Sequence, residues 1–187
     1  MSQPQLLKRL VLALQSLGVP YMLTGSIVSS LQGEPRSTHD IDVVVELDAA
    51  SAGRLRQAFP EPEFYVADIA IREALAHRSM FSVLDTSTGD KIDLWMLTEE
   101  AFDQSRFARR EAAELFGLSM FVSRVEDTIV QKFVWSEMSG GSEKHFRDAL
   151  SVYEVHRESI DASYIEGWAR ALGVLELWGR LVAEAQR

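Results

Sequence analysis

The sequence predicts an α+β fold, with a mixed β-sheet core and flanking helices followed by a C-terminal helical bundle. Helical and strand patterns alternate over residues 1–123, whereas only helical patterns continue after Glu126. Hydrophobic residues make up 47% and charged residues 25% of the 187 residues, the ordinary balance of a globular domain with a sizeable core. We therefore expect two parts, an α/β core at 1–123 and a helical domain at 124–187.

The core is predicted to open with an amphipathic helix over about 4–17. Leucines recur along this segment at helical spacing, and Gly18 followed by Pro20 marks its end. The next expected elements alternate in type: a strand at 21–24, a helix from 25 to about 33, a loop at 34–38 and a strand at 39–46. The last of these is the strongest strand signal in the chain.

The remaining elements of the core follow from breakers and turn residues. They are a helix at 48–59, an ambiguous stretch at 64–78, strands at 81–85 and 91–97, a helix at 99–110 and a short strand near 118–122. The turn-forming residues between the two longer strands predict an antiparallel hairpin. The helical domain should contain helices at about 125–138, 143–157, 161–172 and 174–186, separated by glycines.

The composition argues against several classes of protein. The absence of cysteine excludes disulfides, thiolate nucleophiles and cysteine-ligated zinc. Nineteen Lys and Arg against 28 Asp and Glu give a net charge of -9, which argues against a general nucleic-acid binder that neutralises phosphates. The N-terminal apolar run stops at Gln15, which argues against a signal peptide. No apolar stretch reaches membrane-spanning length. We therefore expect a cytoplasmic protein that does not bind membranes.

Two aspartates mark the strand at 39–46. Asp40 and Asp42 are separated by one residue, so both carboxylates should project from the same face of the strand. Two like charges this close resist burial without a compensating cation, and hard oxygen ligands suit Mg²⁺ or Mn²⁺ with bound phosphates. The alternative is an Asp-x-Asp that is only hydrated on a solvent-facing strand.

The segment upstream offers a candidate phosphate site. Gly25 and Ser26 lie between a predicted strand and a helix start, where free backbone amides and the helix dipole favour an anion. Glycine lets the backbone approach a phosphate closely, and the serine hydroxyl can add a hydrogen bond. A simple helix cap is the alternative interpretation.

Together these segments resemble a known family. Leu23–Ser26 followed by Arg36–Val43 is similar to the Gly-Ser…Arg-x-Thr-x-Asp-x-Asp signature of the DNA polymerase β-like nucleotidyltransferase superfamily. More narrowly, it resembles the minimal bacterial branch that includes the AbiEii-type toxins. The resemblance implies a nucleotidyltransferase-like fold and transfer of a nucleoside monophosphate from a nucleoside triphosphate to a hydroxyl of RNA, a protein or a small molecule. It also implies Mg²⁺ or Mn²⁺ as the cofactor.

The superfamily has a third carboxylate on a neighbouring strand, and Asp93 matches it. Asp93 lies on the polar face of an alternating strand, with apolar residues on the other face. The resemblance implies that Asp40, Asp42 and Asp93 are the catalytic and metal-binding residues. It further implies that Asp93 is the general base or helps a metal to activate the acceptor hydroxyl. Asp85 and Asp90 compete for this role, although both lie at hairpin ends, where Asp is a frequent turn residue.

Five residues are expected to bind nucleotide: Gly25, Ser26, Arg36, Thr38 and Lys132. Gly25 and Ser26 would hold the β and γ phosphates, and Arg36 and Thr38 would contact phosphate or brace their loop. Lys132 resembles a lysine of the AbiEii-like relatives that is thought to contact a nucleotide phosphate. The alternatives are an exposed loop cation for Arg36 and a surface lysine on an amphipathic helix for Lys132.

Other functions on the same fold stay open. The AbiEii-type toxins tend to show Asp-x-x-Asp in their helical part, whereas here Asp148 is followed by Ser151 in the second position. This departure and the acidic composition motivate the alternative of a binding module that holds nucleotide or a partner without turnover. A third possibility is an interaction protein, for example one half of a toxin–antitoxin pair with an antitoxin partner. Trp95, on the predicted face of Asp93, could stack on a base.

Overall fold

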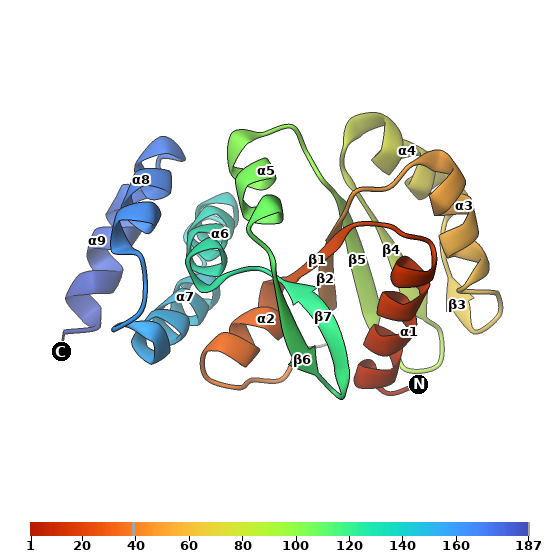
Figure 1. Cartoon of the computed structure of the whole chain (residues 1–187), viewed down its shortest axis with the longest axis horizontal. Coiled ribbons are helices and arrows are strands. Elements are labelled where there is room, and N and C mark those ends of the chain that lie inside the picture. Colours follow the sequence, from red (N-terminus) through yellow and green to blue (C-terminus); the bar gives the residue numbers. More distant parts are fainter. Residues whose placement is uncertain (39, 187) are drawn as a thin grey trace. The chain divides into compact units, whose positions relative to one another are not determined.

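The computed structural model describes residues 1–38 and 40–186, and these form a mixed α/β structure (Figure 1). The strands are β1 (Tyr21–Thr24), β2 (Asp40–Val45), β3 (Phe64–Tyr65), β4 (Met80–Asp85), β5 (Lys91–Met96), β6 (Glu111–Leu115) and β7 (Leu118–Val122). The helices are α1 (Gln3–Ser16), α2 (Gly25–Gln32), α3 (Ala49–Gln57), α4 (Asp68–His77), α5 (Ala101–Ala108), α6 (Val125–Met138), α7 (Glu143–His156), α8 (Ala162–Ala171) and α9 (Leu175–Glu184). The predicted fold class is confirmed.

Contacts between Cα atoms divide the chain into two compact units. The first contains residues 1–24 and 38–122, and the second contains residues 25–37 and those from 123 onward. The sequence prediction placed residues 25–37 in the first part instead. They group with the C-terminal helices because α2 packs against α6 and α7. As domain boundaries, the divisions at 1–123 and 124–187 stay a prediction.

The first unit is built on one mixed sheet. Within the described residues its strand order is β3-β4-β5-β2-β1-β7-β6. The central strand β2 pairs antiparallel with β1 and parallel with β5. The predicted hairpin of β4 and β5 is confirmed as an antiparallel pair. This arrangement puts β2 and β5, the strands that carry the predicted catalytic aspartates, side by side.

The two faces of the central strands differ in character. One face of β2 and β5 is wholly apolar and buried, with Ile41, Val43, Val45, Ile92, Leu94 and Met96 at 3% exposure or less. The other face carries Asp40 and Asp42 on β2 and Asp93 on β5, because side chains two residues apart on a strand point to the same face. The alternation read from the sequence is therefore the alternation of the sheet.

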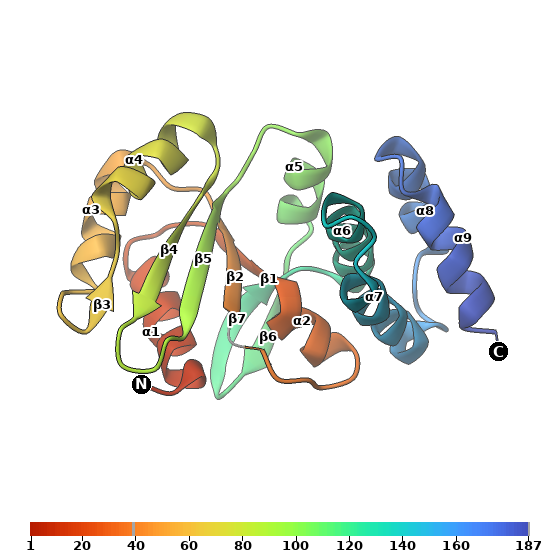
Figure 2. The same ribbon diagram turned by 180° about the vertical axis from the view of Figure 1, so that it is seen from behind.

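Helices bury the apolar parts of this unit. α1 buries Leu6, Leu7, Leu10, Val11 and Leu14, and α1, α3 and α4 gather toward one end of the unit in both views (Figures 1 and 2). At its N-terminus α3 is capped by Asp48, whose carboxylate accepts a hydrogen bond from the Ser51 amide at 2.7 Å. α5 contributes Phe107 to a cluster with Met22, Val44 and Leu97. These contacts fix the sheet that positions the aspartates.

The second unit is helical. α6 and α7 form its main pair, α2 packs on α7 and α6, and α8 and α9 extend the bundle. The end of α2 approaches α7 closely: a Cβ on Gly33 would lie 2.6 Å from Ser151 Oγ and 2.9 Å from the Val152 amide nitrogen. Ser151 Oγ in turn accepts a hydrogen bond from the Glu34 amide at 2.6 Å. Serine after Asp148, the departure from the toxin pattern, is thus part of this helix contact.

Several predicted elements need correction. The stretch at 64–78, which the sequence leaves ambiguous, contains β3 and α4, and β6 at residues 111–115 was not predicted. β6 pairs antiparallel with the predicted strand at 118–122 across a turn at Phe116 and Gly117, both of which have positive φ. Residue 39, included in the predicted strand, lies outside the described residues. Over the described part of the chain, no helix has the length and apolar character needed to cross a membrane.

Candidate active site

The register of β2 and β5 brings two of the predicted aspartates opposite each other. Asp42 and Asp93 are direct partners across this parallel strand pair, and Asp40 stands opposite Lys91. All four side chains belong to the same face because positions two apart on a strand share a face. Asp93 is buried, Asp42 is half-buried and Asp40 is exposed. The structure therefore brings Asp40, Asp42 and Asp93 together on one face of the first unit.

Both oxygens of the buried Asp93 carboxylate accept hydrogen bonds. Ser82 Oγ on β4 donates to Asp93 Oδ1 at 2.6 Å, and Lys91 Nζ lies 2.7 Å from Oδ2. The same ammonium is 3.9 Å from Asp40 Oδ1. The hydrogen bond to Asp93 raises the pKa of Lys91, and the negative charges of Asp93, Asp40 and Asp42 act in the same direction. Neither Ser82 nor Lys91 is identifiable from the sequence, because their roles depend on the strand register.

Asp42 is held from the next position along β5. The Trp95 indole Nε1–H donates to Asp42 Oδ1 at 3.2 Å, and the ring packs against the cluster of Met22, Val44, Leu97 and Phe107. On the other side of β2, Thr24 of β1 is the register partner of Asp42. The expectation that Trp95 stacks on a base stays a prediction, and the structure gives the indole a role in orienting a carboxylate.

The carboxylate oxygens of Asp40, Asp42 and Asp93 suit a hard divalent cation, although the side chains do not form a complete metal site in this structure. Three carboxylates on one strand face offer the oxygen ligands that Mg²⁺ and Mn²⁺ prefer. Within residues 1–38 and 40–186, no group of three or more acidic or histidine side chains is close enough together to hold a metal ion. The Lys91 ammonium supplies the positive charge beside Asp93 and Asp40. The assignment of Asp40, Asp42 and Asp93 as metal ligands stays a prediction.

The two competing aspartates serve the hairpin turn. The Asp85 carboxylate accepts hydrogen bonds from the Ser87 hydroxyl at 2.6 Å and the Ser87 amide at 2.8 Å, and the hydroxyl bond above all lowers the pKa of Asp85. In the alternation of β4, Asp85 shares its face with Phe81 and Val83, not with Ser82. Asp90 accepts a hydrogen bond from Thr88 Oγ1 at 3.0 Å. Turn formation accounts for both residues.

Gly25 and Ser26 begin α2, directly after β1, as predicted. Gly25 has a φ of +74°, a conformation that favours glycine, so the chain can turn sharply into the helix. The Ser26 hydroxyl accepts a hydrogen bond from Arg36 Nη2 at 2.7 Å. The helix start is thus tied to the loop that follows α2, within the second unit.

Arg36 and Lys132 converge on one buried carboxylate of the second unit. Arg36 donates through Nε and Nη2 to the two oxygens of Asp148, both at 2.7 Å, and Lys132 Nζ lies 2.6 Å from Asp148 Oδ2. Lys132 is 1% exposed, so the alternative of a surface lysine is wrong. Arg36, with its side chain 29% exposed, is not a free loop cation either. Two basic side chains, one from the loop after α2 and one from α6, thus contact the same carboxylate of α7.

These charges set the protonation state of Asp148. Burial alone would raise the pKa of Asp148, but the Arg36 hydrogen bond and the Lys132 charge outweigh it, so the pKa lies below its ordinary value. Hydrogen bonding to Asp148 raises the pKa of Arg36. Asp148 and Arg36 are therefore both ionised at neutral pH.

Thr38, the last predicted nucleotide contact, lies in the first unit beside Asp40. Its hydroxyl is 3.4 Å from the Asp40 carbonyl oxygen, and its own carbonyl accepts a hydrogen bond from Gln3 Nε2 at 2.7 Å. These bonds brace the start of β2. Nucleotide binding by Gly25, Ser26, Arg36, Thr38 and Lys132 stays a prediction.

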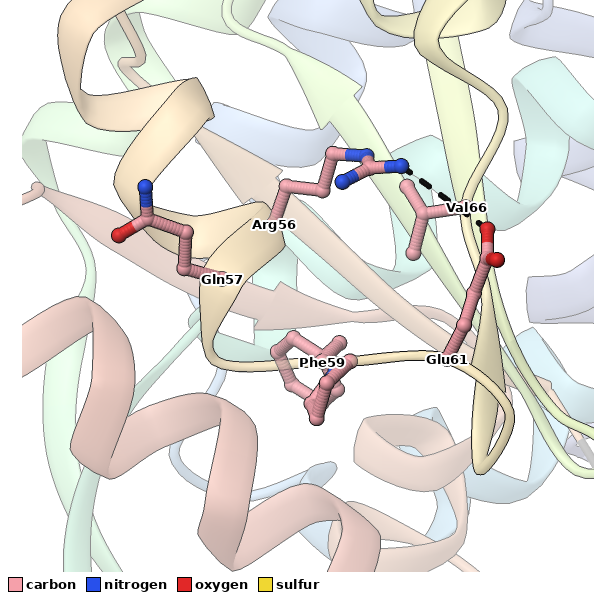
Figure 3. A pocket seen from close by; sticks show the side chains of 6 residues that line it. Arg56, Gln57, Phe59, Glu61 and Val66 are labelled. Carbon is pink, nitrogen blue, oxygen red and sulfur yellow. Dashed lines mark ion pairs between the residues drawn. The ribbon is translucent and has the colours of Figure 1, made fainter.

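A separate hollow of about 340 Å³ lies in the first unit after α3 (Figure 3). It is lined by Arg56, Gln57, Phe59, Pro60, Glu61 and Val66. Arg56 spans part of it with an ion pair of 3.9 Å to Glu61 and another of 2.6 Å to Asp68. None of the predicted site residues lines this hollow, so it is not the candidate active site.

Comparison with known proteins places the fold. No protein-family model and no curated protein matches the chain. The crystal structure of ANT(2")-Ia in complex with adenylyl-2"-tobramycin is similar with a TM-score of 0.60 and 16% identity, covering 92% of this chain and 97% of that one. The lincomycin-bound lincosamide antibiotic adenylyltransferase LnuA has a TM-score of 0.56 and 10% identity, covering 83% of this chain and 98% of that one.

A third similar structure is an antigenic nucleotidyltransferase-like protein from Paracoccidioides brasiliensis. It has a TM-score of 0.54 and 18% identity, covering 80% of this chain and 74% of that one. Identities this low show a shared fold and do not by themselves transfer a function. The chain therefore has the nucleotidyltransferase-like fold that its sequence predicted.

Proposed function

We propose that the protein is a metal-dependent nucleotidyltransferase that transfers a nucleoside monophosphate from a nucleoside triphosphate to a hydroxyl group of a small molecule. One observation carries the proposal: Asp42 and Asp93 stand opposite each other on adjacent strands, with Asp40 on the same face. The likeness of fold supports it, because one similar structure holds adenylyl-2"-tobramycin and another is an adenylyltransferase for a lincosamide antibiotic.

The reaction follows from the roles of these carboxylates. The acceptor hydroxyl oxygen attacks the α-phosphorus, the bond from that phosphorus to the β-phosphate bridging oxygen breaks, and pyrophosphate leaves. Asp93 accepts the hydroxyl proton as general base. Asp40, Asp42 and Asp93 would hold Mg²⁺ or Mn²⁺, which stabilises negative charge on the attacking and leaving oxygens when bound. Trp95 keeps the Asp42 carboxylate in one orientation.

We assign triphosphate binding to the second unit. Arg36 and Lys132 are basic side chains that converge on Asp148, and Ser26 lies within this hydrogen-bonded cluster. Gly25 and Ser26 also form the N-terminus of α2, where backbone amides favour an anion. Thr38 supports the strand start that carries Asp40.

The net charge of the chain favours a small molecule as acceptor. A charge of -9 repels a polyanion such as RNA, whose binding depends on neutralised phosphates. A hydroxyl-bearing antibiotic is the acceptor class that the similar structures suggest. The alternatives to a small-molecule acceptor are RNA and protein, and the alternative biological role is that of a toxin with an antitoxin partner. Growth arrest on expression, relieved by a co-expressed neighbour, would support the toxin role.

Pyrophosphate release tests the proposal directly. Purified protein with Mg²⁺, each of the four NTPs and a panel of hydroxyl-bearing acceptors, tobramycin and lincomycin among them, should release pyrophosphate and form a nucleotidylated product. Asp93→Asn should lower turnover about 10²- to 10⁴-fold through loss of the base, and Asp42→Asn should lower it comparably. Asp68→Asn changes an exposed aspartate of the same unit and should leave turnover unchanged. Equal turnover in wild type and Asp42→Asn would refute the proposal.

A second candidate is a nucleotide-binding module without turnover. The ion pair between Lys91 and Asp93 favours it, because the ammonium occupies one oxygen of the carboxylate that would otherwise accept the proton or bind the metal. Calorimetry with ATP and Mg²⁺ separates the two functions. Binding without pyrophosphate release across the whole acceptor panel would support the module, whereas release would exclude it.

A further inference from the structure

The carboxylate face of the first unit carries its own cation. Lys91 Nζ lies 2.7 Å from Asp93 Oδ2 and 3.9 Å from Asp40 Oδ1, on the strand directly beside β2. The register favours this contact, because Lys91 is the cross-strand partner of Asp40 and stands two residues before Asp93. A lysine at this position neutralises the charges that a divalent metal would otherwise neutralise.

Burial explains why the cation is needed. The Asp93 side chain is 8% exposed, and a buried carboxylate without a compensating charge is strongly destabilising. Both of its oxygens are engaged, Oδ1 by Ser82 and Oδ2 by Lys91. A metal ion could therefore reach Asp93 Oδ2 only after the ammonium has moved.

Exposure explains how the ammonium could move. The Lys91 side chain is 37% exposed, and its ammonium lies at the end of a flexible four-carbon stem, so this charged end can return to solvent without a change in the strand. Ser82, by contrast, is fixed within the sheet as the register partner of Asp93. Of the two donors to Asp93, Lys91 is the one that can leave.

We propose that Lys91 is a displaceable counter-ion: its ammonium neutralises Asp93 and Asp40 in the metal-free protein and withdraws to solvent when a divalent cation binds. This inference rests on the proposed function, because it presupposes that the aspartates bind metal. It adds that the metal-free state is stabilised by the chain itself, at the expense of metal affinity. Lys91 is a positioning residue and does not touch the reacting atoms.

Binding of Mn²⁺ alone, followed by electron paramagnetic resonance of the free ion, measures the competition. Lys91→Met removes the ammonium and keeps the length of the side chain, and should bind Mn²⁺ roughly tenfold more tightly, since no charge-assisted hydrogen bond has to be broken first. Lys91→Arg keeps the charge and should stay near wild type. Lys144→Met makes the same change in net charge at an exposed position of the second unit, and should also bind like wild type.

Thermal unfolding provides a readout that a purely structural lysine would not give. In EDTA, Lys91→Met should melt at a lower temperature than wild type, because Asp93 loses its counter-charge. Saturating Mn²⁺ should remove this difference, since the metal then supplies the charge. A deficit of the same size with and without Mn²⁺ would overturn the proposal.

The wild-type chain allows a test that does not depend on a variant's stability. It has only four lysines, Lys8, Lys91, Lys132 and Lys144, so lysine side chains labelled with ¹³C at Cε should give four resolvable signals. Titration with Mg²⁺ should shift the Lys91 signal, identified by its loss in Lys91→Arg, toward that of a solvated lysine. An unmoved Lys91 signal at saturating Mg²⁺ would overturn the proposal.

The outcomes separate this inference from the function on which it rests. If wild type binds no Mn²⁺, both the metal-dependent function and the role of Lys91 fall. If wild type binds Mn²⁺ and Lys91→Met binds it equally or more weakly, only the role of Lys91 falls. Tighter binding in Lys91→Met, together with rescue of its stability by Mn²⁺, supports both.

Discussion

Asp148 organises the charges of the second unit at the scale of a single residue. Its carboxylate receives two hydrogen bonds from Arg36 and one from the fully buried Lys132. Removing the carboxylate would take this hydrogen-bond acceptor from the buried Lys132 ammonium, and losing one partner of a buried ion pair is costly. The same arrangement ties the loop after α2 to helices α6 and α7.

Replacing Asp148 by Asn should therefore destabilise the protein strongly. We expect a loss of about 3–5 kcal/mol in the free energy of unfolding at pH 7, the usual cost of removing one partner of a buried ion pair. Urea denaturation followed by circular dichroism measures it. Asp68→Asn, which removes an exposed carboxylate paired with Arg56, should cost less than about 1 kcal/mol. Similar losses in the two variants would contradict the assigned role of Asp148.

The pH dependence of this difference has a definite sign. Because the folded-state pKa of Asp148 is depressed, its stabilising contribution is present above the unfolded-state value of about 3.9 and is lost as the pH falls through the folded-state pKa. The gap in unfolding free energy between wild type and Asp148→Asn should thus be full at pH 7 and narrow progressively below about pH 4. A gap that does not change down to pH 3 would argue against an ionised Asp148 in the folded protein.

The residues found from sequence and those missed differ in one physical respect. Alternation along a single strand was enough to put Asp40 and Asp42 on one face, and the same argument placed Asp93. Lys91 comes close to Asp40 only because β5 pairs with β2, and the sequence of either strand alone does not determine the register of this pair. Asp148 likewise meets Lys132 only after α6 and α7 have packed together.

At the scale of elements, the contact between the end of α2 and α7 depends on Gly33. A Cβ at this position would lie 2.6 Å from Ser151 Oγ and 2.9 Å from the backbone nitrogen of Val152. Real Cβ atoms do not approach backbone atoms this closely, so a larger residue must push the two helices apart. The small residue sets how closely these elements approach.

Gly33→Ala should consequently lower the stability of the protein. We expect a loss of about 1–3 kcal/mol in unfolding free energy, the usual cost of overpacking a close contact, measured by thermal or urea denaturation. Gly167→Ala is the matched control in α8 of the same unit, where a Cβ meets nothing within 4 Å. It should raise stability by roughly 0.5–1 kcal/mol through better helix propensity. Equal effects of the two changes would show that the Gly33 contact does not form.

Elements with strong local patterns were predicted well, and those that depend on partners were not. The helices at 125–138 and 143–157 and the β4–β5 hairpin follow from periodicity and turn residues. β6 is rich in Glu and Ala, which are poor strand formers, and it is extended because it pairs with β7. Tertiary pairing overrides local preference in such a strand.

At the scale of the whole molecule, each of the two units is built from two separate segments of the chain. Residues 25–37 leave the sheet unit after β1 and join the helices that follow residue 123. Helical periodicity predicts α2 as an element. Its partners α6 and α7 lie about a hundred residues away in the chain, so the sequence around α2 does not identify them. The predicted boundary near 123 could not take this contact into account.

A chain ending at residue 123 should for this reason fail to fold as a stable domain. Truncation removes α6 and α7, against which α2 packs, and exposes Val28 together with the polar residues Ser29 and Gln32 that are buried with it. We expect the fragment 1–123 to bind the dye ANS and to lack a cooperative thermal transition, whereas the full chain should unfold cooperatively. A fragment 1–123 that melts in a single cooperative step without binding ANS would instead support the division of the chain at residue 123 and show that α2 does not need the C-terminal helices.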